Sequence, residues 1–208
     1  LETPKPLLKI NNHTMLEICI NTLIKLGVKK IYLNTFFLKN KISDYIKEKK
    51  FSVDINIIED GKNILDTGGG ILNLIKDIPD KNFFVFNPDT LWNENYVNEI
   101  EKMQNFYFSK NINNLLLVVK KSLSFDKTLS GDFVLQNEKL KKNEKNSHIY
   151  IGCQILNKDL FKNYELTNFS VSEVWNKLIE KNDLNGFESL NKFYHLTDLN
   201  IFKKLQDL

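Results

Sequence analysis

Residues 83–89 read Phe83-Phe84-Val85-Phe86-Asn87-Pro88-Asp89, an apolar run that ends in polar residues. Four consecutive apolar residues bounded by a turn signal predict a strand that is buried on both faces. A helix is predicted next, at residues 94–108, and a second apolar strand at 115–119. Strand, helix and strand in this order are typical of an α/β fold with a parallel sheet.

The same alternation extends toward the N-terminus. In residues 15–26 apolar side chains recur at helical spacing, with Thr14 as N-cap, Glu17 as its capping-box partner and Gly27 as the stop signal. Further strands are predicted at 31–34 and 53–58, and further helices at 39–50 and from residue 67 onward. Residues 1–120 are therefore expected to form the main sheet and its helices.

After residue 120 the pattern changes. Strands are predicted at 133–136, 149–156 and 192–196, in a smaller and partly antiparallel region, and helices at 172–181 and 198–207. Because no linker-like segment separates this region from the rest, residues 1–208 are predicted to form one domain. The predicted fold class is α/β, with a mixed, mostly parallel sheet and helices on both faces.

The composition indicates a globular protein and argues against two kinds of partner. Of 208 residues 42% are hydrophobic, and no apolar run approaches the roughly 20 residues that span a membrane. All 29 basic residues are lysines and the net charge is only +3, so we do not expect nucleic-acid binding. No secretory signal is visible, and Cys19 and Cys153 are predicted to be buried free thiols of a cytoplasmic protein.

Lys5 lies between two prolines, in the segment Thr3-Pro4-Lys5-Pro6. Prolines hold the backbone extended, so the ammonium group could reach a phosphate at little cost in ordering. The alternative is a lysine in a surface turn.

A glycine triplet stands at the predicted start of a helix, in Asp66-Thr67-Gly68-Gly69-Gly70. Glycines let a ligand approach the backbone, and a helix N-terminus has free N–H donors, so this motif could hold a phosphate or a nucleobase. Alternatively it is a flexible turn that Asp66 or Thr67 caps.

Asp89 follows the buried strand at 83–86. In open α/β sheets ligands bind beyond the carboxyl ends of the strands, and Mg²⁺ takes one or two carboxylates together with substrate phosphates. Asp89 could therefore hold Mg²⁺. The alternative is an Asn-Pro-Asp turn in which Asp89 caps the next helix.

These motifs in this order resemble the sugar-1-phosphate nucleotidyltransferase family over nearly the whole chain. The family's strand-end motif is usually Asn-Gly-Asp, where this chain has Asn87-Pro88-Asp89. Within the family the sequence is most similar to the N-acetylmuramate-1-phosphate uridylyltransferase branch. That similarity lies in Asp66–Gly70, Ser130–Phe133, Tyr150–Gly152 and Phe169–Trp175.

The resemblance implies a Rossmann-like, GT-A-like enzyme in which residues 1–120 bind the nucleotide and 121–208 the sugar phosphate. The implied reaction transfers a nucleoside monophosphate from a nucleoside triphosphate (UTP) to a sugar 1-phosphate (N-acetylmuramate 1-phosphate), with Mg²⁺ and release of pyrophosphate. Its setting would be peptidoglycan recycling. The implied site residues are Lys5 and Asp89 for catalysis, Asp89 and His195 for the metal, Thr67, Gly68, Gly69, Gly70 and Asn87 for the nucleotide, and Asp132, Gly152, Ser170 and His195 for the sugar phosphate.

Two departures from the family pattern bear on activity. The family usually has a late aspartate as second metal ligand, and His195 stands at that position here. Mg²⁺ prefers oxygen ligands, so His195 could instead hydrogen-bond the sugar phosphate or a metal-bound water, while Asp198 is expected to cap the last helix.

The second departure is at the N-terminus. The family opens with a strand and a Gly-x-Gly-x-Arg loop just before the segment that matches Thr3–Pro6. That strand would be central in the sheet, so without it we expect an open slot lined by unpaired backbone groups. We therefore favour a preceding segment in the complete protein, and expect no turnover from a protein that begins at Leu1.

Other functions on the same scaffold stay open. The substrate could be a mannose, glucose or heptose 1-phosphate, or phosphocholine with CTP, and the protein could also be an inactive nucleotide-binding homologue. The sequence predicts no oligomeric state.

Overall fold

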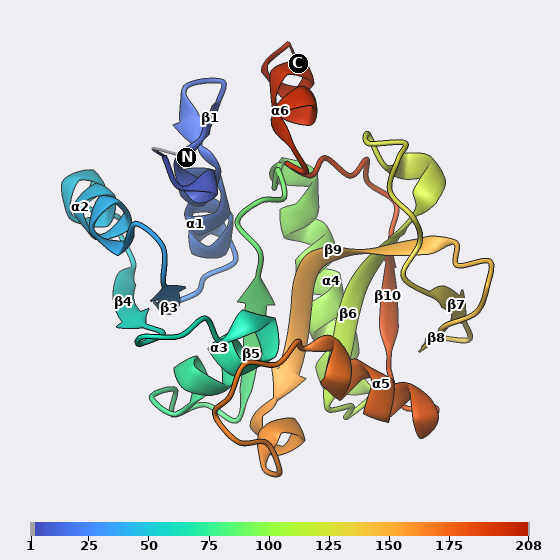
Figure 1. Ribbon diagram of the computed structural model, residues 1–208. Coiled ribbons are helices and arrows are strands. Elements are labelled where there is room, and N and C mark those ends of the chain that lie inside the picture. The colour runs from blue at the N-terminus through green and yellow to red at the C-terminus, as the bar shows by residue number, and fades with distance from the viewer. Residues whose placement is uncertain (1–2, 208) are drawn as a thin grey trace.

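The computed structural model describes residues 3–207, which form an α/β fold with helices on both faces of a mixed sheet (Figure 1). Four strands pair in the order β10 (Gly186–Ser189), β6 (Asn114–Lys120), β9 (His148–Asn157) and β5 (Asn82–Phe86). β10 is parallel to β6, whereas β9 is antiparallel to both of its neighbours. The apolar run at 83–86 is therefore a sheet strand, as predicted, and its carboxyl end lies at the same edge as that of β6.

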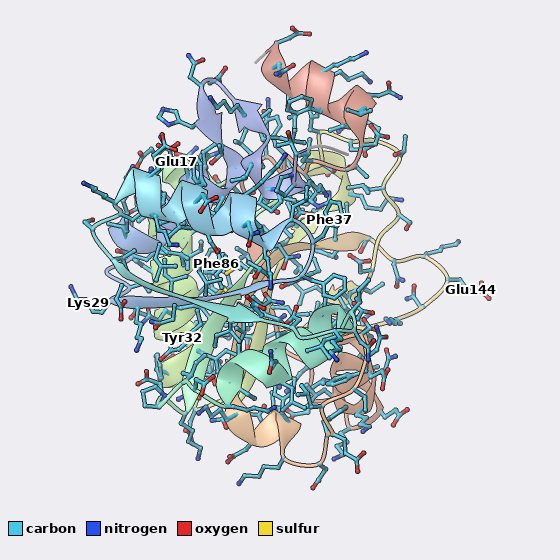
Figure 2. All side chains as sticks on the ribbon, turned by 60° about the vertical axis from the view of Figure 1, so that its left-hand side comes forward. Glu17, Lys29, Tyr32, Phe37, Phe86 and Glu144 are labelled. Atoms are coloured by element: carbon cyan, nitrogen blue, oxygen red, sulfur yellow. The ribbon has the colours of Figure 1, made fainter. Side chains whose placement is uncertain are left out.

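A second pair of parallel strands, β3 (Lys30–Thr35) and β4 (Asp54–Glu59), stands apart from this sheet. Within residues 3–207, β3 pairs only with β4 and β5 only with β9. A cavity of about 750 Å³ is lined by residues of both β3 and β5. Figure 2 brings this side forward and labels Tyr32 and Phe86, which line the cavity from the two strands. The sequence predicted an open slot within the sheet, and this cavity lies between two strands that each have an unpaired edge among residues 3–207.

The two faces of the sheet bury separate apolar clusters. Side chains alternate along a strand, so Leu115, Leu117 and Val119 of β6 face one cluster while Leu116 and Val118 face the other. Helices α1 (Met15–Lys25), α2 (Lys39–Lys49) and α4 (Glu94–Ser109) contribute to the first cluster. Helices α3 (Asp66–Ile75) and α5 (Ser172–Glu180) cover the second. All five named β6 side chains are fully buried, which explains why this strand reads as a continuous apolar run.

The start of α1 is capped as predicted, but only by half of the expected motif. The Oγ1 atom of Thr14 accepts the Glu17 N–H at 3.0 Å. The Glu17 carboxylate instead accepts hydrogen bonds from Tyr45 and Lys49 of α2. Gly27 follows the helix with φ of 76°, the left-handed conformation that stops a helix. Glu17 therefore ties α1 to α2 and does not close a capping box.

The prediction of a strand at 192–196 is wrong. Phe193 and His195 form single bridges, to Ser124 and Thr90, because the segment crosses two loops and does not run beside a strand. The prediction also missed β10. The remaining elements are β1 (Lys9–Ile10), β2 (His13–Thr14), β7 (Val134–Gln136), β8 (Lys139–Lys141) and α6 (Leu199–Gln206), with 3-10 turns at Lys5–Leu7, Lys121–Leu123 and Lys158–Phe161.

Two smaller predictions are confirmed. Cys19 and Cys153 are buried free thiols, and the Asp198 carboxylate caps α6 by accepting the N–H groups of Asn200 and Ile201. In the part of the chain that the structure describes, no helix combines the length and apolar character needed to cross a bilayer.

Candidate active site around Asp89

The turn after β5 is fixed by backbone contacts with β9. The Asn87 N–H donates to the Gly152 carbonyl at 2.7 Å, and the Trp92 indole N–H donates to the Asn87 carbonyl at 3.1 Å. Gly152 has φ of 90°, and a Cβ added there would lie 2.8 Å from the Cβ of Asn87. Only glycine both adopts this φ and leaves room for Asn87, so the end of β5 and β9 can come into contact here. Residues 87–90 therefore lie at the edge of the sheet formed by the carboxyl ends of β5 and β6.

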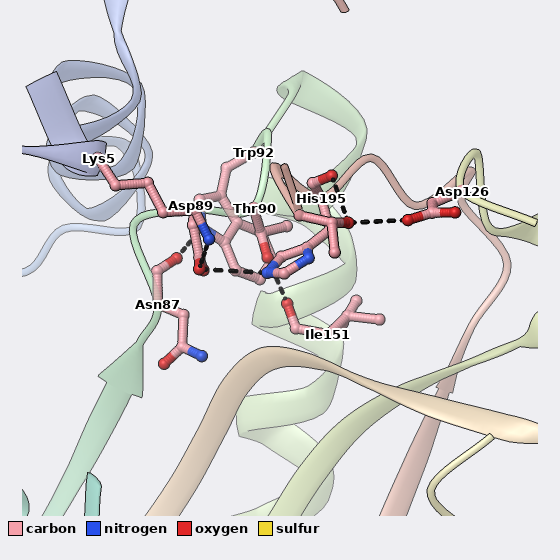
Figure 3. Close-up of polar contacts among 9 residues, drawn as sticks. Lys5, Asn87, Asp89, Thr90, Trp92, Asp126, Ile151 and His195 are labelled. Atoms are coloured by element: carbon pink, nitrogen blue, oxygen red, sulfur yellow. Dashed lines mark hydrogen bonds and ion pairs between the residues drawn. The ribbon is translucent and has the colours of Figure 1, made fainter. Parts of the chain in front are cut away.

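Asp89 joins a lysine and a histidine from opposite ends of the chain (Figure 3). Its Oδ2 atom lies 2.7 Å from Lys5 Nζ and 3.2 Å from His195 Nε2. Its Oδ1 atom is buried and has no hydrogen-bond partner among residues 3–207. Burial alone would raise the pKa of Asp89, but His195 and then Lys5 lower it to about 2. The carboxylate is therefore charged at neutral pH, with one oxygen still free to bind a ligand.

The loop that carries His195 is hydrogen-bonded to the turn that carries Asp89. Thr90 and His195 form an antiparallel bridge, and the Leu196 N–H donates to the Asp89 carbonyl at 2.8 Å. The buried Thr90 hydroxyl donates to the Ile151 carbonyl of β9 at 2.8 Å. Asp89 does not cap a helix, because Asn93 caps α4. The turn interpretation of Asp89 as a helix cap is thus wrong.

A buried carboxylate, that of Asp126, contacts the other side of the loop that carries His195. Its Oδ2 atom accepts the Thr197 hydroxyl at 2.9 Å, and its Oδ1 atom accepts the N–H and hydroxyl of Thr128. The hydrogen bonds from Thr128 are the main cause of a lowered pKa of Asp126. Sequence reasoning missed this residue. Asp-x-Thr is a local turn signal, but nothing in the sequence indicates a partner 71 positions away.

One atom of the site, Asp89 Oδ1, is suited to bind a divalent cation. The buried, unpartnered Oδ1 of Asp89 is the hard oxygen ligand that Mg²⁺ prefers, whereas Oδ2 is taken by Lys5 and His195. Residues 3–207 contain no group of three or more His, Cys, Asp and Glu side chains placed to hold a metal. A cation bound here would therefore depend on substrate oxygens. His195 faces the same carboxylate oxygen as Lys5, with Nε2 3.2 Å from Oδ2, and its role as a metal ligand stays a prediction.

A small cavity of about 210 Å³ lies beside Asp89 and collects four of the predicted site residues. They are Asn87, Asp132, Gly152 and His195. The Asp132 carboxylate accepts the Tyr150 N–H at 2.9 Å, and burial raises the pKa of Asp132. The remaining lining residues are Thr90, Leu129, Ser130, Ile149, Tyr150, Ile151 and Phe193. The structure therefore assembles one pocket from residues that the sequence separates widely.

Two other predicted residues line the larger cavity. Thr67 and Ser170 lie there together with Asn87. Thr67 Oγ1 accepts the Val171 N–H, and Ser170 Oγ accepts the Ser172 hydroxyl. Ser170, expected at the sugar, is thus on the side of Thr67 and not in the small cavity with Asp132.

The glycine triplet serves packing in this structure. The N–H groups of Gly68 and Gly69 both donate to the Phe169 carbonyl, at 2.9 and 3.1 Å. A Cβ on Gly68 would lie 2.3 Å from the Phe169 ring, and one on Gly69 would lie 2.2 Å from the Thr167 carbonyl oxygen. Glycine is needed there because residues 167–169 lie directly against α3. Two of the N–H donors that could have bound a phosphate are therefore already used, and the role of the triplet in nucleotide binding stays a prediction.

The α/β fold is shared with solved structures of nucleotidyltransferases. HddC from Yersinia pseudotuberculosis has this fold, with a TM-score of 0.78 at 20% identity, over 99% of this chain and 89% of that one. UDP-glucose pyrophosphorylase in complex with UDP-glucose aligns with a TM-score of 0.74 at 15% identity, over 98% and 89%. The model of the family "Nucleotidyl transferase" matches residues 1–122, and this chain belongs to that family.

A curated relative is also similar in sequence. The D-glycero-alpha-D-manno-heptose 1-phosphate guanylyltransferase of Campylobacter jejuni is 28% identical over 178 residues, which cover 83% of this chain and 75% of that protein.

Proposed function

We propose that this protein transfers a nucleoside monophosphate from a nucleoside triphosphate to a sugar 1-phosphate and releases pyrophosphate. The observation that carries the proposal is the position of Asp89, whose free Oδ1 lies beside a lysine and a histidine at the ligand edge of the sheet. Family membership supports the reaction class.

In the proposed reaction the sugar phosphate oxygen attacks the α-phosphorus of the nucleotide. Mg²⁺ bound through Asp89 would neutralise charge on the phosphates. Lys5 is 40% exposed in its side chain, so its ammonium group can turn from Asp89 to a phosphate oxygen. Catalysis then consists of positioning and charge neutralisation, as in other phosphoryl transfers.

The two cavities suggest which residues would contact each of the two substrates. Thr67 and Asn87 would contact the nucleotide in the larger cavity. Asp132, Gly152 and His195 would contact the sugar phosphate in the smaller one. Ser170 lines the larger cavity, so any contact with the sugar phosphate would have to come from that side.

Two substrate pairs have specific support. The motif resemblance favours UTP with N-acetylmuramate 1-phosphate, which would serve peptidoglycan recycling. The relative from Campylobacter jejuni favours GTP with D-glycero-α-D-manno-heptose 1-phosphate. We place the guanylyltransferase reaction first, because it rests on similarity over 178 residues and the other on four short motifs.

The test is a substrate panel on the full-length protein with Mg²⁺. Each of UTP, GTP, CTP and ATP is combined with N-acetylmuramate, heptose, mannose and glucose 1-phosphates and with phosphocholine, and pyrophosphate release is measured. One strongly preferred pair supports the proposal and names the substrate. Nucleotide binding without pyrophosphate release from any pair would instead identify a non-catalytic homologue.

A further inference from the structure

Two tyrosine hydroxyls are buried without any hydrogen-bond partner among residues 3–207, those of Tyr150 and Tyr164. A buried hydroxyl that makes no hydrogen bond is destabilising, because it has lost its contacts with water. One explanation for such a group in a native protein is a partner that is bound only in the functional complex. The surroundings of the two tyrosines show which of them has room for that partner.

Tyr150 stands at the junction of the two cavities. Of residues 3–207, Tyr150 and Asn87 are the two that line both cavities. Its ring lies edge-on against Trp175, with centroids 4.9 Å apart, and its backbone N–H donates to Asp132. The ring thus packs against Trp175, and no group among residues 3–207 uses its hydroxyl.

The hydroxyl is neutral and close to the site. Burial raises the pKa of Tyr150 well above its usual range, and the side chains of Cys153 and Asp89 raise it further. A neutral phenol next to a charged carboxylate can donate a hydrogen bond to a ligand oxygen without adding negative charge to the site. This is the chemistry required where an anionic substrate comes close to Asp89.

We propose that the Tyr150 hydroxyl donates a hydrogen bond to the sugar 1-phosphate where that substrate lies between the two cavities. Tyr150 is then a specificity-determining residue of the proposed reaction, and the inference rests on that reaction. The sugar 1-phosphate is favoured over the nucleotide because Tyr150 also lines the smaller cavity, where Asp132 and His195 lie.

Tyr164 provides a matched control. Its ring stacks on Phe169, with centroids 5.0 Å apart, and carries Lys177 Nζ 4.1 Å above it. It lines neither of the two cavities described above. Tyr164 therefore has no contact with the proposed site. Replacing it with Phe removes the same hydroxyl group as Tyr150→Phe does, but away from the site.

The experiment compares Tyr150→Phe with Tyr164→Phe in the full-length protein. Neither change removes a hydrogen bond within residues 3–207, so neither variant should unfold at a lower temperature than the wild type. Titration with D-glycero-α-D-manno-heptose 1-phosphate and with N-acetylmuramate 1-phosphate should show binding of the accepted sugar weakened roughly three- to tenfold in Tyr150→Phe, as expected for one lost hydrogen bond. The nucleotide KM should not change in either variant.

The outcomes separate the inference from the proposed function. If the wild-type protein turns over a sugar 1-phosphate but Tyr150→Phe binds it as well as Tyr164→Phe does, the role of Tyr150 is wrong and the reaction stands. Weakened nucleotide binding with unchanged sugar phosphate binding would also overturn it. If the wild type accepts no sugar 1-phosphate at all, the proposed function fails and the inference fails with it.

Discussion

Lys5 and Asp89, 84 positions apart in the sequence, form an ion pair with Nζ 2.7 Å from Oδ2. His195 reaches the same oxygen from the other end of the chain, at 3.2 Å. The N-terminal segment, the end of β5 and the C-terminal loop therefore meet at one carboxylate. Its second oxygen is buried and free of partners within the described residues, and this asymmetry is what makes Asp89 a site for a cation.

The lowered pKa of Asp89 predicts an acid-dependent loss of stability. Its folded-state pKa of about 2 lies below the value of about 3.9 expected in the unfolded chain. The charged carboxylate thus stabilises the fold above about pH 4, by on the order of 2 kcal/mol, and this contribution is lost as the pH falls toward 2. Urea unfolding between pH 7 and pH 2 should show a smaller pH dependence in Asp89→Asn than in wild type. The exposed Asp44→Asn is the control, and equal pH profiles for all three proteins would contradict the prediction.

Gly152→Ala should disrupt the junction of β5 and β9. The new Cβ would meet the Cβ of Asn87 at 2.8 Å, on a backbone with φ of 90°. Gly61→Ala is a matched control, since Gly61 has φ of 88° and nothing within 4 Å of its Cβ position. Strain alone costs about 1–2 kcal/mol, and overpacking adds about 1–3 kcal/mol. Thermal unfolding should therefore show a larger loss for Gly152→Ala, together with reduced turnover. Equal losses would mean that the close contact is relieved elsewhere.

Thr197→Val should loosen the loop that carries His195. The change removes the hydroxyl that donates to Asp126 at 2.9 Å. One lost hydrogen bond costs about 1 kcal/mol of stability. Thr22→Val is the control, because its hydroxyl makes a comparable bond, to the Ile18 carbonyl within α1. Both variants should lose similar stability, but only Thr197→Val should lower kcat. A similar kcat in the two variants would argue that the Asp126 contact does not position His195.

In a protein that consists of residues 1–208, the facing edges of β3 and β5 should exchange their amide hydrogens quickly. Among residues 3–207 each strand pairs on one edge only, and the other edge lines the cavity of about 750 Å³. The central strand β6 has partners on both sides and should be protected. Hydrogen exchange followed by mass spectrometry or NMR measures this directly. Slow exchange along both edges in the full-length protein would show that another segment pairs with them.

Much of the fold could be predicted because its signals are local. The apolar run at 83–86, the helical spacing at 15–26 and the strand at 115–119 each reflect burial along a few neighbouring residues. The position of Asp89 at the ligand edge follows from the end of β5. The pairing of β9 between β5 and β6 could not be predicted, because antiparallel register depends on contacts between distant segments.

The positions of site residues could be predicted where the chemistry of a single residue indicates its place. They could not be predicted where the role of a residue depends on contacts with distant segments. Lys5 and His195 were both expected near Asp89, and both contact it. Gly68 and Gly69 look like a ligand loop in sequence, but the Phe169 carbonyl takes their N–H groups. Such a partner, about 100 positions away, leaves no pattern around the glycines themselves.

The most direct test is the Mg²⁺-dependent release of pyrophosphate by the full-length protein and by Asp89→Asn, with the substrate pair that the panel selects. Asparagine keeps the size of the side chain but removes the anionic oxygen that would hold the cation. We expect turnover by the wild type and a loss on the order of 10²- to 10³-fold in kcat for the variant, with nucleotide still bound. Turnover by Asp89→Asn at the wild-type rate would contradict a catalytic cation at this carboxylate.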